Sequence, residues 1–172
     1  MSVSKLKQII PCPSDPKDIL DREEILNTQQ GLSLDFPDDF IEFIESYGSG
    51  CLACFYHVWN PFNSKIFLKY VDDICWHERD FKRMYPESVP YEIYPNTSGF
   101  LPWGSDDNGN YYGWLTKGEP NEWKVMTNEV RGDGYELHHV GFLDYFLEVF
   151  AGNIEPLASG YPNKECYKFR SY

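Results

Sequence analysis

The chain has 172 residues, of which 42% are hydrophobic, and carries 15 lysines and arginines against 27 aspartates and glutamates. This length suits one domain with a sizeable core, and the formal net charge of −12 makes nucleic acid and anionic membranes poor partners, because phosphate binding needs basic side chains. No apolar run has the length of a signal peptide or a membrane span, so we expect a cytoplasmic protein. The acidic excess indicates either solubility alone or a basic protein partner.

Hydrophobic periodicity predicts mainly helices in the first half of the chain. The predicted elements are an N-terminal arm over residues 1–15, a helix over 16–30 that stops at Gly31, a helix over 37–47, a buried strand over 51–59 and a helix over 71–85. The helix over 37–47 has the strongest pattern, because its apolar residues recur at i, i+3, i+4 and i+7 and Gly48 follows. The run 66–70 fits either a strand or the start of the next helix.

The second half predicts a three-stranded meander followed by a helix. The predicted elements are strands over 100–103, 111–115 and 123–127, a strand over 135–140, a helix over 142–150 that stops at Gly152, and a C-terminal extension over 153–172. Asn108-Gly109 indicates a tight hairpin turn, and Tyr161, Tyr167 and Phe169 could pack the extension onto the domain. We therefore predict a single α+β domain over 16–152, with a twisted antiparallel sheet flanked by helices.

In order and spacing, three segments resemble the SUKH superfamily, whose domain occurs in bacterial immunity proteins and in fungal cell-wall assembly regulators. These segments are Phe36 to Gly50, Leu101 to Trp114 and Phe142 to Leu147. One departure is Asn110, where many members carry an aspartate. The resemblance implies an α+β fold, no catalysis, and binding of a cognate toxin, often a nuclease or deaminase, inside the producing cell.

The motifs that could carry metal or catalytic chemistry are weak. Cys51-x-x-Cys54 lies in the predicted strand, where the two side chains would point to opposite faces, and the five scattered cysteines fit reduced thiols. The segment 105–110 fails as a calcium loop, because the twelfth position is Leu115. No nucleophile, base and orienting acid share a local spacing. The sequence predicts no enzyme, no metal site and no cofactor.

The leading hypothesis is therefore a non-enzymatic immunity protein that occludes a basic toxin. The residues predicted to bind that partner are Asp106, Asp107, Asn108, Tyr112, Glu119 and Glu122, in the polar turns of the meander. The alternative is a regulatory module that binds a ligand or carbohydrate through Trp103, Trp114 and Trp123. The sequence leaves open which toxin is bound and what the oligomeric state is.

Overall fold

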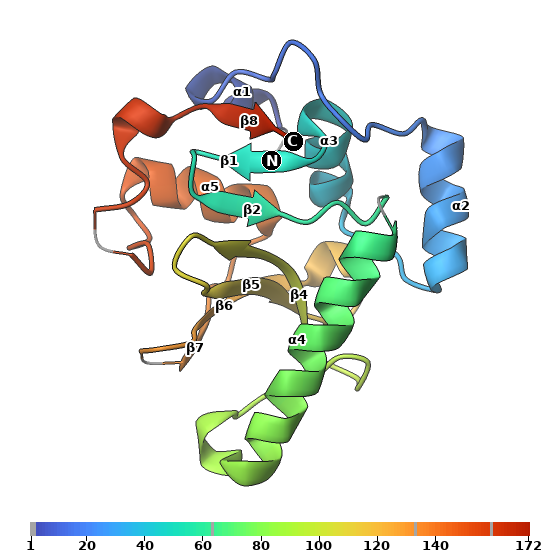
Figure 1. Cartoon of the computed structure of the whole chain (residues 1–172), viewed down its shortest axis with the longest axis vertical. Coiled ribbons are helices and arrows are strands. Elements are labelled where there is room, and N and C mark those ends of the chain that lie inside the picture. The colour runs from blue at the N-terminus through green and yellow to red at the C-terminus, as the bar shows by residue number, and fades with distance from the viewer. Residues whose placement is uncertain (1–2, 63, 133, 159) are drawn as a thin grey trace.

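The computed structural model describes residues 3–62, 64–132, 134–158 and 160–172 and has the predicted α+β architecture, with helices on both faces of one sheet (Figure 1). The order of the strands in the sheet is β7-β6-β5-β4-β2-β1-β8. All neighbours along this path are antiparallel, and β3 pairs with β4 in parallel. Among the described residues the strands are β1 (Gly50–Leu52), β2 (Tyr56–Val58), β3 (Glu92–Ile93), β4 (Gly99–Asp106), β5 (Tyr111–Leu115), β6 (Lys124–Glu129), β7 (Gly134–Leu137) and β8 (Phe169–Ser171).

Two helices cover the rear face of the sheet as seen in Figure 1, and a third crosses its front face. The helices of the described chain are α1 (Ser4–Ile9), α2 (Arg22–Leu32), α3 (Asp38–Tyr47), α4 (Ser64–Met84) and α5 (Phe142–Ala151), with short 3-10 turns η1 (Pro86–Ser88), η2 (Pro120–Glu122) and η3 (Lys164–Cys166). Helices α3 and α5 lie behind the sheet, α4 lies in front, and α2 stands at the margin. The run 66–70 is part of α4, which settles the choice between strand and helix.

The rear layer is held together by aromatic side chains. Their ring centroids lie close in three pairs between helix and strand: Phe40 and Trp114 at 4.9 Å, Trp103 and Phe142 at 4.8 Å, and Tyr56 and Phe146 at 5.2 Å. All six side chains are buried, and burying a large apolar side chain contributes roughly 1.5–3 kcal/mol. This explains why both helices were visible in the sequence: their apolar stripes are the surfaces that meet the sheet.

A carboxylate of α3 caps the start of α5. The residue before α5 is Gly141, which has no side chain to bond the free backbone N–H groups of the first turn. Asp39 Oδ2 accepts a hydrogen bond from the N–H of Leu143 at 3.0 Å and takes over that role. Burial raises the pKa of Asp39, although its backbone hydrogen bonds act in the opposite direction. The bond fixes the two rear helices relative to each other.

The predicted buried strand over 51–59 is wrong, because the chain reverses within it. Strands β1 and β2 form a hairpin in which Leu52 pairs with Tyr56. The central turn residues, Ala53 and Cys54, have φ angles of 53° and 52°, in the left-handed region usually filled by glycine or asparagine. Because alanine and cysteine are not typical turn residues, the apolar sequence gives no indication that the chain reverses here.

The first predicted helix begins later than expected. Helix α2 starts at Arg22, after Asp21, whose side chain accepts from the N–H groups of Glu23 and Glu24 in a capping box. Lys17, which lies in the predicted helix, instead forms a backbone bridge with Gly48. A Cβ atom at Gly48 would lie 1.9 Å from the Lys17 oxygen, so glycine is required there, with φ at +70°.

Both ends of the described chain pack against the domain. In α1, which lies in the predicted N-terminal arm, the side chain of Leu6 is fully buried. At the other end β8 adds to the sheet next to β1, and the ring of Phe169 lies 5.1 Å from that of Tyr47 and 6.1 Å from that of Phe43. The C-terminal segment therefore supplies one edge of the sheet.

Candidate functional site

Two of the residues predicted to contact a partner are buried, so their expected exposure is wrong. Asp106 is 4% exposed and Tyr112 is fully buried. The Asp106 carboxylate accepts hydrogen bonds of 2.9–3.0 Å from the backbone N–H groups of Asn108 and Asn110, the Asn110 amide and the Tyr112 hydroxyl. Asp106 therefore holds the β4–β5 turn together from inside, and the side-chain amide of Asn110 donates one of these hydrogen bonds.

The four remaining predicted residues are exposed but lie in two separate places. Asp107 and Asn108 are in the β4–β5 turn, where Asp107 Oδ1 lies 2.7 Å from His57 Nε2. Glu119 and Glu122 belong to η2, after the other end of β5, and form a capping box with each other's backbone. Because the five residues of β5 span roughly 17 Å, the two turns form no single patch.

The tryptophans of the meander are part of the core. Trp103 and Trp114 are fully buried against α3 and α5, and Trp123 is buried beside Trp114 at a ring distance of 5.8 Å. A sugar-binding aromatic needs an exposed ring face, so these three side chains offer no stacking platform. The expectation that they could bind carbohydrate is wrong for this conformation.

The cysteines and histidines form no recognisable chemical centre. Cys51 is in β1 and Cys54 is in the turn that follows it. The expectation that their side chains point to opposite faces of one strand therefore does not apply. Burial raises the pKa values of Cys51 and Cys75 to about 12, which keeps both as unreactive thiols. Within the described ranges no three His, Cys, Asp or Glu side chains are grouped in a way that could hold a metal ion.

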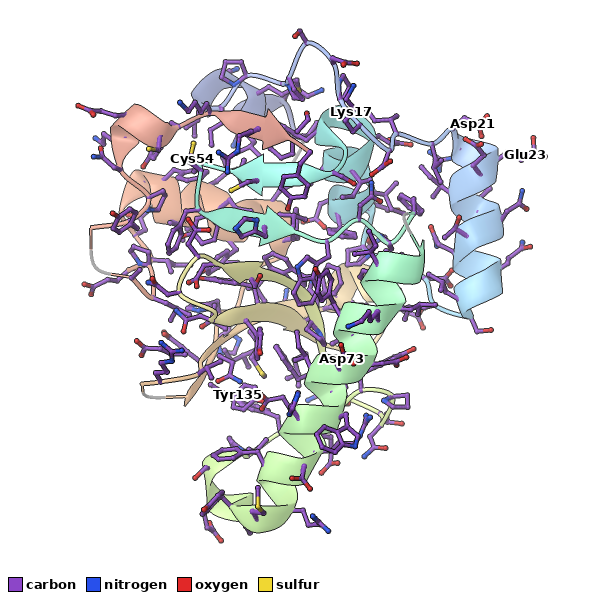
Figure 2. The ribbon with its side chains drawn as sticks, in the orientation of Figure 1. Lys17, Asp21, Glu23, Cys54, Asp73 and Tyr135 are labelled. Carbon is purple, nitrogen blue, oxygen red and sulfur yellow. The ribbon has the colours of Figure 1, made fainter. Side chains whose placement is uncertain are left out.

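The front face of the sheet is only partly covered by α4. The strand register aligns one residue from each strand of the main path across this face, namely Arg170, Cys51, His57, Ser105, Tyr111, Asn128 and Tyr135. Glu78 of α4 is buried against one end of this row, where it accepts hydrogen bonds from Asn128 Nδ2 at 3.2 Å and from the Tyr135 hydroxyl. Figure 2 shows Tyr135 beside α4.

Two hollows flank α4 on this front face, and His77 and Tyr111 line both of them. One, of about 780 Å³, opens towards β6 and β7, and the other, of about 950 Å³, opens towards β2 and β4. Exposed apolar side chains of α4 border them, including Tyr70, Phe81 and Met84. Asp73 and Asp80 also line the hollows, but they are paired with Lys69 and Arg83. Glu78, Glu87 and Glu129 also line the first hollow, so the front face combines aromatic surface with carboxylates.

A second candidate surface, which we call the acidic face, surrounds the N-terminal half of α3. Two hollows of about 500 and 530 Å³ lie side by side there and share Asp38, Glu42 and Asn121. The acidic residues that line them are Asp35, Asp38, Asp39, Glu42, Glu45, Glu119 and Asp144, and the basic ones are Arg22 and Lys124. In the part of the chain that the structure describes, no ion pair involves any of these seven carboxylates. The face therefore has an excess of carboxylates over basic side chains, although one of them, Asp39, is half-buried and bonded to the N–H of Leu143.

The family model described as SMI1-KNR4 cell-wall (SUKH_6) matches residues 22–146. The chain belongs to the SUKH family. The comparison with curated proteins and the comparison with solved structures gave no match. SUKH domains are generally immunity or regulatory proteins, not enzymes.

The match locates both candidate surfaces within the SUKH domain. It begins at the first residue of α2 and ends inside α5, so it includes the whole acidic face and the hollows beside α4 except for Asp18 and Tyr172. No helix in the described residues is long and apolar enough to cross a membrane.

Sequence reasoning identified Glu119 on the acidic face of this SUKH domain and missed most of the rest. Asp35 lies just before α3 and Glu45 lies in it, whereas Asp144 lies in α5, and only the packing of α2, α3, η2 and α5 brings the three together. The one usable signal in the sequence is Asp38-Asp39 at the predicted start of the second helix, and acidic residues there are equally expected from the helix dipole alone.

Proposed function

We propose that this SUKH protein is a cytoplasmic, non-enzymatic immunity protein that binds and neutralises a cognate protein toxin with a basic surface. The acidic face carries the proposal: seven carboxylates line two adjoining hollows beside one arginine and one lysine. Complementary charge of this kind speeds encounter and excludes wrongly charged partners. A nuclease or deaminase that binds nucleic acid has a basic surface that such a face can occlude.

Neutralisation by occlusion requires that the acidic face cover the basic rim of the toxin's substrate site. Glu42 and Glu45 lie on α3 and Glu119 lies just before η2, and the three carboxylates would meet separate cationic side chains. Glu122 lies next to them in η2 and extends the charge. Asp107 and Asn108, at the far end of β5, would belong to a separate contact.

The test is co-expression with toxins encoded beside this gene, with survival and co-purification as readouts. The triple variant Glu42→Gln, Glu45→Gln, Glu119→Gln should slow association by at least about tenfold at low salt, and the difference should shrink as salt screens the charges. The matched control, Asp72→Asn, Glu87→Gln, Glu155→Gln, removes three exposed charges elsewhere and should slow it far less. If the intact protein protects against none of the neighbouring toxins, the immunity function is wrong; if both triple variants bind alike, the acidic face is not the contact.

A regulatory module that binds a ligand on the front face is a second candidate, supported by the hollows of about 780 and 950 Å³ beside α4. Such volumes match those of small-molecule sites. Thermal stabilisation by cell-wall fragments that is lost in Tyr111→Ala, together with no toxin bound, would favour this function over the first.

A further inference from the structure

One of the two hollows of the acidic face has the lining of a side-chain pocket. It has a volume of about 530 Å³ and lies between α2, α3 and η2. Ile25, Leu26 and Ile41 form its apolar wall, and carboxylates from α3, η2 and the α2–α3 connection surround them. Figure 1 shows α2 at the margin of the molecule, away from the sheet. Its residues Arg22, Ile25, Leu26 and Gln29 line one side of this pocket.

A buried glutamine in this pocket has an unused acceptor. Gln29 is 7% exposed, and its Nε2 donates to Asp35 Oδ1 at 2.9 Å. Because an ionised carboxylate only accepts hydrogen bonds, the amide NH₂ must face Asp35 and the amide oxygen is directed elsewhere. That oxygen, Oε1, is buried and has no hydrogen-bond partner among the described residues. A buried carbonyl without a donor is destabilising, and a ligand that supplies the donor would remove that cost.

We infer that this pocket receives a guanidinium group on an aliphatic stem, the side chain of an arginine. A guanidinium carries five N–H donors in a planar fork and no acceptor, so it can serve the oxygen of Gln29 and the carboxylates of Asp38 or Glu45 at once. The methylenes of its stem would cover Ile25 and Leu26. An ammonium has its three donors on one atom and satisfies separated acceptors less well.

The pocket must open slightly to admit this group, because the oxygen of Gln29 is covered. Leu26, 51% exposed, and Arg22, also exposed, line the pocket and are long side chains that can move aside. Arg22 is also a cation at the same site, so it competes with an incoming arginine. Its removal should therefore strengthen binding.

The inference rests on the proposed function in one respect: the arginine is expected to belong to the basic toxin. A free small guanidinium compound has the same chemistry and is the other source. The probes are therefore agmatine, which has a guanidinium at one end and an ammonium at the other, 1,4-diaminobutane as the equally charged counterpart with two ammonium groups, and the pentapeptide Gly-Gly-Arg-Gly-Gly with blocked ends. Binding is followed by the NMR signals of the Gln29 side-chain amide and the backbone amides of α2 in the full chain.

Agmatine should shift these signals saturably and bind about tenfold more tightly than 1,4-diaminobutane. Gln29→Met should weaken agmatine binding by about tenfold, whereas the matched variant of its exposed neighbour, Gln30→Met, should leave it unchanged. Arg22→Met should tighten it. Glu45→Gln, on the surface of α3, should weaken it and serves if Gln29→Met does not fold.

Equal binding of agmatine and 1,4-diaminobutane, or unchanged binding in Gln29→Met, would overturn the pocket assignment. Tighter binding of the peptide than of agmatine supports an arginine from a protein, and the reverse order overturns that source. The two proposals fail separately. Protection against a toxin without any agmatine binding rejects the pocket alone, and agmatine binding without protection rejects the immunity function alone.

Discussion

The carboxylate of Asp106 accepts four hydrogen bonds inside the β4–β5 turn, whereas the carboxylate of Asp107 is more than half exposed and contacts His57. From the sequence both residues had the same interpretation, because adjacent aspartates before an Asn-Gly turn give no sign of which one points inward. The register decides this: Asp106 pairs with Tyr56, whose side chain is in the rear core.

Exchanging each aspartate for alanine should separate the two roles. Asp106→Ala leaves buried donors of Asn110 and Tyr112 unpaired and should lower the free energy of unfolding by about 3 kcal/mol. Asp107→Ala removes an exposed contact and should cost less than about 1 kcal/mol. Urea denaturation of both variants checks this, and equal losses of stability would contradict the buried role of Asp106.

At the scale of elements, the best-predicted parts are those whose local pattern and tertiary role agree. Helices α3 and α5 and strands β4 to β6 were predicted because the side chains that set their periodicity are the ones buried in the core. The β1–β2 hairpin was missed because both its strands and its turn are apolar. Helix α2 was misplaced at its start because a backbone bridge between Lys17 and Gly48, distant in sequence, keeps the chain extended there.

The cap that α3 provides for α5 gives a test of how these helices depend on each other. Asp39→Ala removes the acceptor for the Leu143 N–H and should destabilise the protein by about 1 kcal/mol or somewhat more. Asp39→Asn keeps an acceptor of similar geometry and avoids a buried charge, so its free energy of unfolding should stay close to that of the parent. Chemical denaturation distinguishes them; if asparagine is as damaging as alanine, the oxygen of Asp39 does not act as the cap.

At the scale of the whole molecule, the attachment of α4 to the sheet depends on the protonation of one buried carboxylate. Burial raises the pKa of Glu78, and the hydrogen bonds from Tyr135 and Asn128 only partly offset that effect. The folded protein therefore holds this proton more tightly than the unfolded chain does. The stability contributed by protonated Glu78 is fully present below pH 4.5. It is lost as the pH rises through the pKa of Glu78 in the folded protein.

Glu78→Gln removes this dependence. The free energy of unfolding of Glu78→Gln minus that of the parent should increase from pH 4 to pH 7, because only the parent pays for ionising the buried group. Tyr135→Phe removes a hydrogen bond that stabilises the ionised carboxylate of Glu78. The protein should therefore lose stability more steeply as the pH rises. Urea titrations at several pH values measure both differences, and a flat or decreasing difference for Glu78→Gln would show that the charge is not costly.

The composition shows that the protein carries a net negative charge. The composition does not predict where on the surface the carboxylates gather. The acidic face combines Asp35, Glu119 and Asp144, which are separated by tens of residues and meet only after the sheet and rear helices form. The pocket at Gln29 was equally invisible, because nothing in the sequence of α2 distinguishes it from the exposed Gln30. Local patterns identify elements, whereas surfaces assembled from several elements require the fold.

The burial of the tryptophans gives the molecule an intrinsic optical reporter. Trp59, Trp103, Trp114 and Trp123 are at most 8% exposed, whereas Trp76 on α4 is 59% exposed and its ring lies 4.9 Å from that of His77, which lines both front hollows. A quencher such as acrylamide should therefore reach the emission of Trp76 almost alone. A partner on the acidic face would leave that emission open to quenching, and a partner on the front face would shield it, so the unlabelled protein can report which face is occupied.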